Sequence, residues 1–271
     1  MNRFSRSFLW SVGLLLTTLT LSGCGSFPGG GLRPGGFTTV VIDAGHGGKD
    51  NGESPNQFLK EKEVALDTAK RLERLLSDSG LRTVMTRRDD VFVELDDRVR
   101  IADRYYPNAI LVSIHYNASP SSNPRGVETF FWRTDSYGLA TRVQRHLIGE
   151  TGLDNRGVTR RVLRLTHNPR VPAILCECGF LTNRTEANLA SSASFRQHAA
   201  QGIADGVLEE QENGDVNIGR LPPENRPVYT RPSRQHHTGT SHRKKMAKVN
   251  KAREKARAKK AQKRHRKHGN N

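Results

Sequence analysis

The chain has 271 residues, of which 34 % are hydrophobic and 6 % aromatic, a lean composition that suits one medium-sized domain with appendages. Residues 212–271 hold 18 Lys and Arg against 4 Asp and Glu, whereas residues 1–211 hold 26 against 23. The net charge of +17 is therefore divided into +14 and +3, which excludes a uniformly basic chain and assigns the basic character to the C-terminal segment.

The N-terminal segment has the pattern of an export signal. Two arginines precede residues 9–21, a 13-residue apolar stretch that is too short to span a bilayer comfortably. The stretch ends in "LSGC", which resembles the bacterial lipobox and implies cleavage before Cys24 and lipidation of its thiol. An ordinary signal peptide or a short anchor is the alternative. We expect a lipoprotein signal peptide over residues 1–23 and a Gly-rich tether, "GSFPGGGLRPGG", that ends at residue 36.

Apolar periodicity predicts alternating strands and helices from residue 37 to residue 211. Strands are expected at 37–42, 81–87, 109–115, 126–132, 162–165 and 173–179, and helices at 61–79, 95–106, 136–151 and 194–209. This alternation predicts a three-layer α/β/α single domain with a mostly parallel or mixed central sheet. The apolar pattern stops after residue 211, so residues 212–271 are predicted to be a disordered basic tail.

The stretch "AILCECGF" places Glu177 in the middle of an otherwise apolar strand, where an unpaired carboxylate costs several kcal/mol to bury. Cys176 and Cys178 flank it, and they are either a metal or redox pair or two small hydrophobic residues of a core. Alternation along a strand places both cysteines on one face and Glu177 on the other. The strand is thus expected to be amphipathic, with the carboxylate facing something other than the core.

Three further residues with metal-binding side chains lie near strand ends or at a helix start. His46 lies in "DAGHGG" after the first strand, His115 ends "AILVSIH", and Glu61 opens the first predicted helix. Each has a simple structural explanation on its own. Because ligands of open α/β sheets bind beyond the carboxyl ends of strands, however, these residues are expected to converge. Two histidines and one carboxylate form a known set of ligands in hydrolytic zinc sites. Since the chain offers two carboxylates, Glu61 and Glu177, one of them is not needed as a ligand.

Several segments carry a family resemblance in their order and intervals, namely "VVIDAGHGGKDNG", "LKEKEVALD", "SIHYNA", "GVETFF" and "PAILCECGFLTN". Together they resemble the zinc-dependent N-acetylmuramoyl-L-alanine amidases of the bacterial cell wall, the amidase type 3 family. The resemblance implies one Zn²⁺ ion held by His46, Glu61 and His115, with Glu177 as the catalytic carboxylate. It also implies hydrolysis of the amide bond between N-acetylmuramic acid and L-alanine in peptidoglycan, in cell-wall remodelling or daughter-cell separation.

The sequence departs from the usual family pattern at a few positions, among them Ala44 and Tyr116, which concern the shape of the rim. Arg98 and Asn117 match common family positions and are candidates to line the substrate cleft. Both also have structural alternatives, since Arg98 can hold a helix by a salt bridge and Asn117 can cap a turn.

The sequence disfavours functions other than an amidase. A silent wall-binding lipoprotein is disfavoured because all four site residues are present, and other zinc hydrolases because their motifs are missing. The expected partners are peptidoglycan, a membrane through lipidated Cys24, and anionic envelope polymers through the basic tail; nucleic acid is not expected, and the chain is expected to be a monomer. The expected location is the cell envelope, and Gly25 favours the periplasmic side of an outer membrane if the cell has one.

Overall fold

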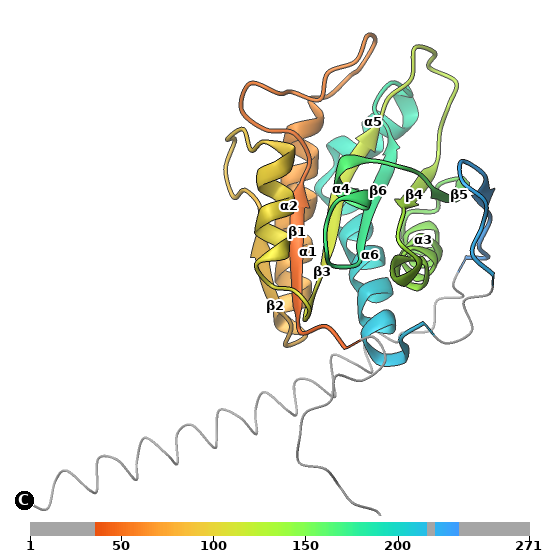
Figure 1. Cartoon of the computed structure of the whole chain (residues 1–271). Helices are drawn as coiled ribbons and strands as arrows, with labels where there is room; N and C mark the ends of the chain where they lie inside the picture. The colour runs from red at the N-terminus through yellow and green to blue at the C-terminus, as the bar shows by residue number, and fades with distance from the viewer. Residues whose placement is uncertain (1–35, 216–219, 233–271) are drawn as a thin grey trace, which may run out of the picture. The chain divides into compact units, whose positions relative to one another are not determined.

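The computed structural model describes residues 36–215 and 220–232 (Figure 1). The predicted signal peptide, Cys24, nearly all of the tether and most of the predicted tail lie outside the described residues. Within the described part of the chain, no helix combines the length and apolar character needed to cross a membrane.

A seven-stranded mixed sheet forms the centre of the domain, in the order β2-β1-β3-β6-β4-β5-β7. The strands β2, β1, β3 and β6 are parallel, β4 is antiparallel to β6 and parallel to β5, and β7 is antiparallel to β5. The bounds are β1 Thr39–Ala44, β2 Arg82–Met85, β3 Ala109–Asn117, β4 Val127–Phe131, β5 Asn155–Arg160, β6 Ala173–Phe180 and β7 Pro227–Val228. The carboxyl ends of β3 and β6 therefore lie beside the amino-terminal end of β4.

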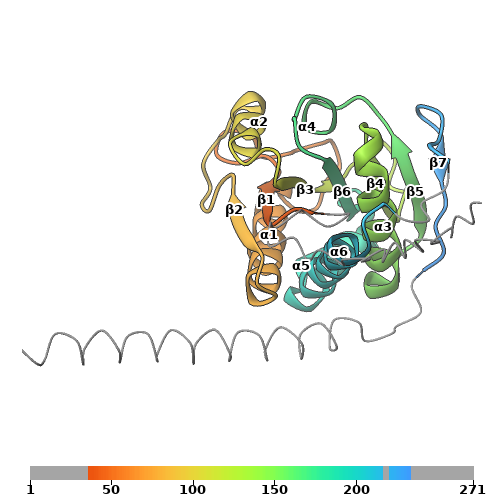
Figure 2. The ribbon, with the colours of Figure 1, turned by 60° about the horizontal axis from the view of Figure 1, so that its bottom comes forward.

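Helices cover both faces of this sheet, which confirms the predicted α/β/α architecture (Figure 2). The helices α1, α3 and α6 lie on one face, and α2 and α4 on the other. Their bounds are α1 Glu61–Asp78, α2 Leu95–Asp103, α3 Tyr137–Thr151, α4 Arg164–His167, α5 Arg184–Ser191 and α6 Ala193–Asn213, with a 3₁₀ turn at Thr134–Ser136 before α3.

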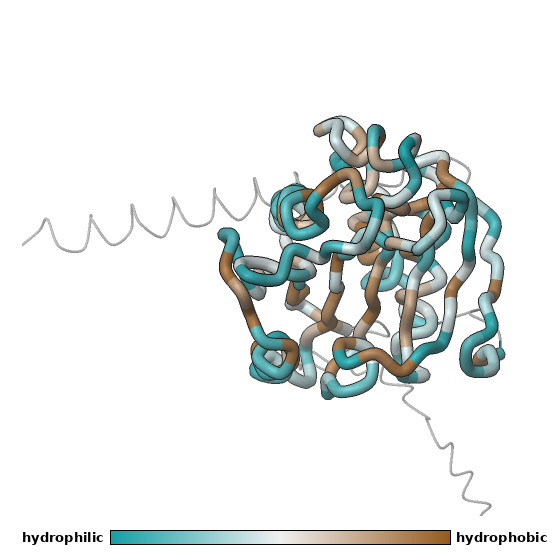
Figure 3. The backbone as a smooth tube through the Cα atoms, turned by 90° about the horizontal axis from the view of Figure 1, so that it is seen from above, coloured by the Kyte–Doolittle hydropathy of each residue, from teal (hydrophilic) through white to brown (hydrophobic). Residues whose placement is uncertain are grey.

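The two faces of the sheet bury unequal amounts of apolar surface. Val40 and Ile42 of β1 pack towards α1, α3 and α6 in the larger core, whereas the intervening Val41 packs towards α2 and α4. Burial of each such side chain contributes about 1.5–3 kcal/mol. Hydrophobic segments accordingly gather in the strands at the centre of the domain (Figure 3). Because α2 has nine residues and α4 only four, the helical layer on their side is smaller than the layer of α1, α3 and α6.

The prediction for residues 162–165 is wrong. The strand is β5, and the apolar residues of "VLRL" belong to the connection that follows and to α4. Leu165 is buried in the smaller core as part of α4, and this explains its apolar character without a strand. β5, "NRGVTR", carries one apolar side chain, so its sequence has no strand-like hydrophobic pattern. The helix α5 was also missed.

The domain extends further than the predicted boundary after residue 211. α6 runs to Asn213, and β7 pairs with β5 at the edge of the sheet. The segment 220–232, predicted as part of a disordered tail, therefore includes a strand. A two-residue edge strand has too few side chains to show a hydrophobic period, and it tolerates Pro227 because an edge position needs hydrogen bonds on one side only.

Candidate metal centre and active site

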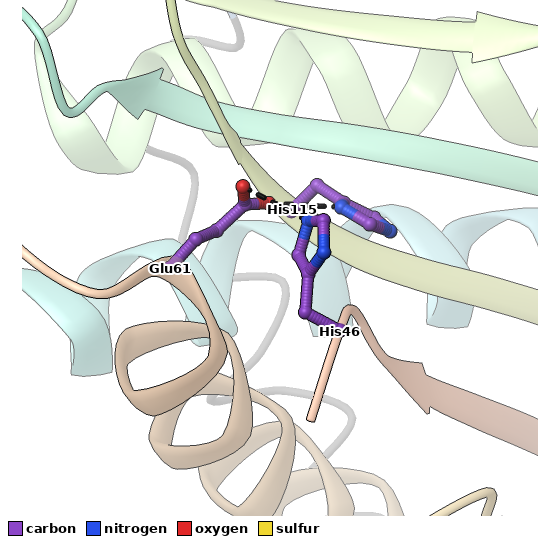
Figure 4. A group of neighbouring side chains, drawn as sticks. All are labelled: His46, Glu61 and His115. Atoms are coloured by element: carbon purple, nitrogen blue, oxygen red, sulfur yellow. Dashed lines mark hydrogen bonds and ion pairs between the residues drawn. The ribbon is translucent and has the colours of Figure 1, made fainter. Parts of the chain in front are cut away.

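The sheet brings the predicted ligands to one edge. β1 and β3 are paired side by side up to Ala44 and Ile114, so that His46 and His115 follow at the same end of the sheet. Glu61 is the first residue of α1, and the loop between His46 and α1 returns it to this edge. Figure 4 shows the three side chains pointing toward one another from β3, α1 and the loop after β1. The structure thus brings together residues that are far apart in the sequence.

Nitrogen and oxygen atoms of these side chains converge within 4.8 Å of one another. Glu61 Oε2 lies 3.0 Å from His46 Nε2, and Glu61 Oε1 lies 2.8 Å from His115 Nδ1. The rings of His46 and His115 meet edge to face, with centroids 4.9 Å apart. Two imidazoles and one carboxylate are the donor set of hydrolytic zinc sites, so the residues present fit a zinc ion.

The loop between β1 and α1 holds His46 in position. Asp50 Oδ2 lies 2.9 Å from His46 Nδ1, and Asp50 Oδ1 accepts a hydrogen bond from the backbone N–H of Gly52 at 3.0 Å. This contact fixes the tautomer in which His46 Nε2 is free to bind a cation. Gly52 has φ +66, and a Cβ there would lie 2.7 Å from His46 Cδ2 and from Glu61 Cβ, so only glycine fits.

The electrostatics of the centre are set by its own three groups. Burial alone would raise the pKa of Glu61, but hydrogen bonds and positive charge from His115 and His46 outweigh it and lower this pKa to about 2. Burial alone would lower the pKa of His115, but the hydrogen bond and charge of Glu61 raise it to about 9. The centre thus holds an ionised carboxylate whose counter-charge is either imidazolium protons or a cation.

Glu177 lies directly beside this centre, as the register partner of His115 on β6. Its Oε2 is buried and has no hydrogen-bond partner among the described residues. Burial raises the pKa of Glu177 to about 8, and the neighbouring His115 opposes this rise only in part. Cys176 and Cys178 are free thiols, 0 % exposed, in the larger core on the opposite face. The core interpretation of the two cysteines is therefore confirmed.

Residues 40–209 match the family of N-acetylmuramoyl-L-alanine amidases. The chain belongs to this amidase family. LytC, an N-acetylmuramoyl-L-alanine amidase of Bacillus subtilis (strain 168), is 38 % identical over 174 residues, which are 63 % of this chain and 35 % of LytC. The probable cell wall amidase LytH of Staphylococcus aureus is 35 % identical over 171 residues, 62 % of this chain and 57 % of LytH. The chain thus spans about a third to somewhat over half of these relatives.

A solved structure supports the same assignment. The catalytic domain of CwlV, an N-acetylmuramoyl-L-alanine amidase from Bacillus (Paenibacillus) polymyxa var. colistinus, superposes with a TM-score of 0.61 at 36 % identity. The superposition covers 65 % of this chain and 99 % of that domain. The described part of this amidase-family chain therefore contains the counterpart of a whole catalytic domain.

Arg98 takes the structural one of its two predicted alternatives, an ion pair that holds its helix. Its side chain is 2 % exposed, and its Nη1 donates to Asp43 Oδ1 at 2.8 Å and to the carbonyl oxygen of Ala44 at 2.7 Å. Its Nη2 donates to the carbonyl oxygen of His46 at 2.7 Å. Because these partners belong to β1 and to the turn that carries His46, Arg98 orients this turn.

Asn117 caps a turn, which is one of its two predicted alternatives, whereas contact with substrate stays a prediction. It ends β3, and its Oδ1 accepts a hydrogen bond of 2.8 Å from the backbone N–H of Ala118, which caps the turn there. It also lines a cleft of about 870 Å³ that runs over β4 and β5 of the amidase domain.

Two carboxylates near the amidase centre were missed from the sequence. Asp50 supports His46, as described above. Its position in the glycine-rich loop, four residues after His46, could have indicated this contact. Glu128 is the register partner of Glu177 on β4, lines the cleft, and accepts a hydrogen bond from Thr159 Oγ1 at 2.8 Å. Alternation in "VETFF", with its buried aromatic residues, could have placed Glu128 on the face away from the larger core.

Proposed function

We propose that this chain is a zinc-dependent N-acetylmuramoyl-L-alanine amidase, which hydrolyses the amide bond between N-acetylmuramic acid and the L-alanine of the stem peptide in peptidoglycan. Membership in the amidase family supports the reaction class. The observation that carries the proposal is the carboxylate of Glu177, buried and unpaired at its Oε2, next to the convergent His46, Glu61 and His115.

His46, Glu61 and His115 would hold the zinc ion. When bound, zinc supplies Lewis acidity and lowers the pKa of water from about 15.7 to about 7. The chain's own residues keep this set in place: Asp50 fixes the tautomer of His46, and Arg98 holds the backbone turn that carries it.

Glu177 would move the proton of the reaction. The free Oε2 accepts a proton from the attacking water as the new carbon–oxygen bond forms, and it later delivers this proton to the amine nitrogen as the carbon–nitrogen bond breaks. The buried carboxylate beside the candidate metal ligands is placed for both steps, because it can hold the proton between the two halves of the reaction.

The test is digestion of purified peptidoglycan by the purified protein, with the products identified by mass spectrometry. We expect intact stem peptides that begin with L-alanine, and glycan strands that carry free lactyl groups. A chelator should abolish their release and added zinc should restore it. Products cut within the glycan or within the peptide, or release that survives thorough chelation, would contradict the proposal.

We also propose a location and partners outside the catalytic domain. The similarity of this chain to a probable cell wall amidase supports action outside the cytoplasm. The lipobox-like "LSGC" supports export and lipid anchoring at Cys24, at the periplasmic side of an outer membrane if the cell has one. Residues 243–267 hold 14 Lys and Arg and a single acid, which supports salt-sensitive attraction to anionic envelope polymers or lipid head groups.

A further inference from the structure

The cleft lined by Glu128, the register partner of Glu177, has one side formed by residues outside the amidase family match. The cleft, of about 870 Å³, has Glu128 and Thr159 on its floor, and the segment after β3, with Ala118 and Pro120, forms one side. The opposite side is formed by residues 220–232, which we call the strap, whereas the family match ends at residue 209. The strap therefore forms a wall of the cleft from residues outside the family match.

The strap is fixed to β5 at several points. β7 pairs Pro227 with Thr159 and Val228 with Val158. The backbone N–H of Asn225 donates to the carbonyl oxygen of Arg160 at 2.9 Å, and Asn155 Nδ2 donates to the carbonyl oxygen of Thr230 at 2.6 Å. Figures 1 and 2 show this segment at the edge of the sheet, next to β5.

The approach of the strap to β5 depends on a glycine. Gly157 has φ +90, and a Cβ on it would lie 2.8 Å from the carbonyl oxygen of Val228 and 3.1 Å from Pro227 Cβ. Any larger residue would push the strap away from β5. The sequence of β5 thus agrees with a docked strap.

Three side chains of the strap line the cleft, namely Asn225, Pro227 and Tyr229. Tyr229 is 67 % exposed, the highest value among the large exposed hydrophobic side chains of the described residues. Aromatic rings with a polar tip are effective binding groups, because they contribute a large contact area and one hydrogen bond at low entropic cost. An exposed tyrosine on the wall of a cleft is thus suited to contact a bound ligand.

Three arginines line the cleft, and two of them are paired with acidic residues of the same cleft. Arg125 Nε lies 2.6 Å from Asp154, and Arg156 Nε lies 3.6 Å from Glu128, so these two arginines have acidic partners. Arg161 also lines the cleft, and its guanidinium lies over the ring of Phe130 at 5.4 Å. Among the described residues, Arg161 has no acidic partner, which leaves one cation of the cleft available to a carboxylate.

We propose that the strap and Arg161 form a specificity site for the acidic peptide part of the substrate, with Tyr229 against the peptide and Arg161 paired with one of its carboxylates. This inference rests on the proposed function. The scissile amide divides the substrate into a glycan, whose lactyl carboxyl is consumed in the bond, and a peptide that ends in a free carboxylate. Of these two parts, only the peptide supplies a carboxylate that can pair with Arg161.

The test measures binding of two probes to the full-length, zinc-loaded protein by titration calorimetry. One probe is a tetrapeptide that begins with L-alanine and has free carboxylates, and the other is the same peptide with every carboxylate converted to a carboxamide. The variants are Arg161→Gln and Tyr229→Ala. The matched control is Arg74→Gln, an exposed arginine of α1 on the opposite face of the sheet. Zinc content and circular dichroism verify that each variant is folded.

The original protein should bind the acidic peptide about 5- to 30-fold more tightly than the carboxamide, the range of a partly exposed charged hydrogen bond. Arg161→Gln should abolish this preference, Tyr229→Ala should weaken both peptides, and Arg74→Gln should change neither. No preference in the original protein, a preference that survives Arg161→Gln, or unaltered binding by Tyr229→Ala would overturn the proposal. Cleavage of a muramoyl peptide, measured in parallel, distinguishes failure of the amidase proposal from failure of the peptide-site proposal. If the protein prefers the acidic peptide but does not cleave the muramoyl peptide, only the amidase proposal is refuted.

Discussion

Glu61 and Glu177 are both carboxylates at the same edge of the sheet, yet their surroundings differ in kind. Both oxygens of Glu61 contact imidazole nitrogens, and Oε1 also accepts a hydrogen bond from the backbone N–H of Tyr116 at 2.9 Å. The Oε2 of Glu177 is buried without such a partner among the described residues. The first environment suits a metal ligand, and the second suits a group that exchanges protons.

This difference predicts separable effects of substitution. Glu177→Gln should retain zinc and lose about 10²- to 10⁴-fold in turnover, because the glutamine cannot carry the proton. His46→Ala should lose zinc itself, because only two ligands remain. Zinc content by elemental analysis and cleavage of a muramoyl peptide check both. If Glu177→Gln also empties the site, Glu177 is a ligand and the assignment of roles is wrong.

Arg98 and Asp43 form a buried ion pair beneath the centre, with exposed fractions of 2 % and 0 %. Positive charge from Arg98, and hydrogen bonds from Thr86 and Ser113, outweigh the effect of burial and lower the pKa of Asp43. Removing one partner of a buried pair leaves an uncompensated charge, so Arg98→Ala should lower the free energy of unfolding by about 3–5 kcal/mol. Urea denaturation measures this loss. Arg74→Ala, at an exposed site, should change it by less than about 0.5 kcal/mol, and an equal effect of both variants would contradict the structural role of Arg98.

The sequence is sufficient to predict that His46, Glu61 and His115 converge, because they lie at or after strand ends or at a helix start that the hydrophobic pattern reveals. Alternation along its strand also places Glu177 away from the core, whereas the roles of all four residues remain predictions that rest on the family resemblance. The sequence is not sufficient for Arg98. Its partner Asp43 belongs to β1, and the two residues meet only because α2 packs across that strand. Such pairing depends on tertiary packing, which no local pattern of residues encodes.

At the level of elements, the accuracy of prediction follows the amount of apolar surface that each element buries. β3 and β6 are buried on both faces over most of their length and were predicted within two residues. β5 was missed because one of its faces forms the floor of a polar cleft, so its residues do not follow a hydrophobic alternation. α5 is a two-turn helix with a clear Asn183 cap, and its eight residues are too few for a convincing period.

The packing of α3 against α6 includes a charged cluster that predicts a pH effect. Glu209 of α6 contacts Arg145 and His146 of α3, the latter at 2.6 Å. Burial would raise the pKa of Glu209, but these hydrogen bonds lower it to about 2 from 4.5. The folded state therefore favours the ionised form, and its contribution is present above pH 4.5 and is lost as the pH falls towards 2.

Solvent screening of this partly exposed group reduces the contribution to about 1–2 kcal/mol. The difference in unfolding free energy between the original protein and Glu209→Gln should therefore shrink between pH 5 and pH 2.5, measured by denaturation of the metal-free protein. Glu212→Gln, at an exposed position near the end of α6, is the control. A difference that stays constant over this range would contradict the prediction.

For the whole molecule, the boundary of the folded unit decides where the chain can be shortened. A protein that ends after residue 232 keeps the strap, whereas one that ends after residue 219 loses β7 and the partner of Asn155. With backbone hydrogen bonds worth about 0.5–1.5 kcal/mol each, the shorter protein should be less stable by about 1–3 kcal/mol. Thermal unfolding of the two truncated proteins and the full chain measures this. Equal stability of all three would show that the strap contributes nothing to the fold.

The free energy of local unfolding is expected to differ between the central strands and the edge strand, because they differ in length and in the number of paired neighbours. β3 has nine residues and is paired on both sides, by β1 and β6, whereas β7 has two residues and a single neighbour. In deuterium exchange, amides of residues 109–117 should exchange only through global unfolding, and amides of the strap should exchange through local detachment at a much lower free energy. An acidic peptide that contacts the strap should slow the second process and leave the first unaffected. The exchange rate of the strap amides would thus report whether a ligand occupies the cleft.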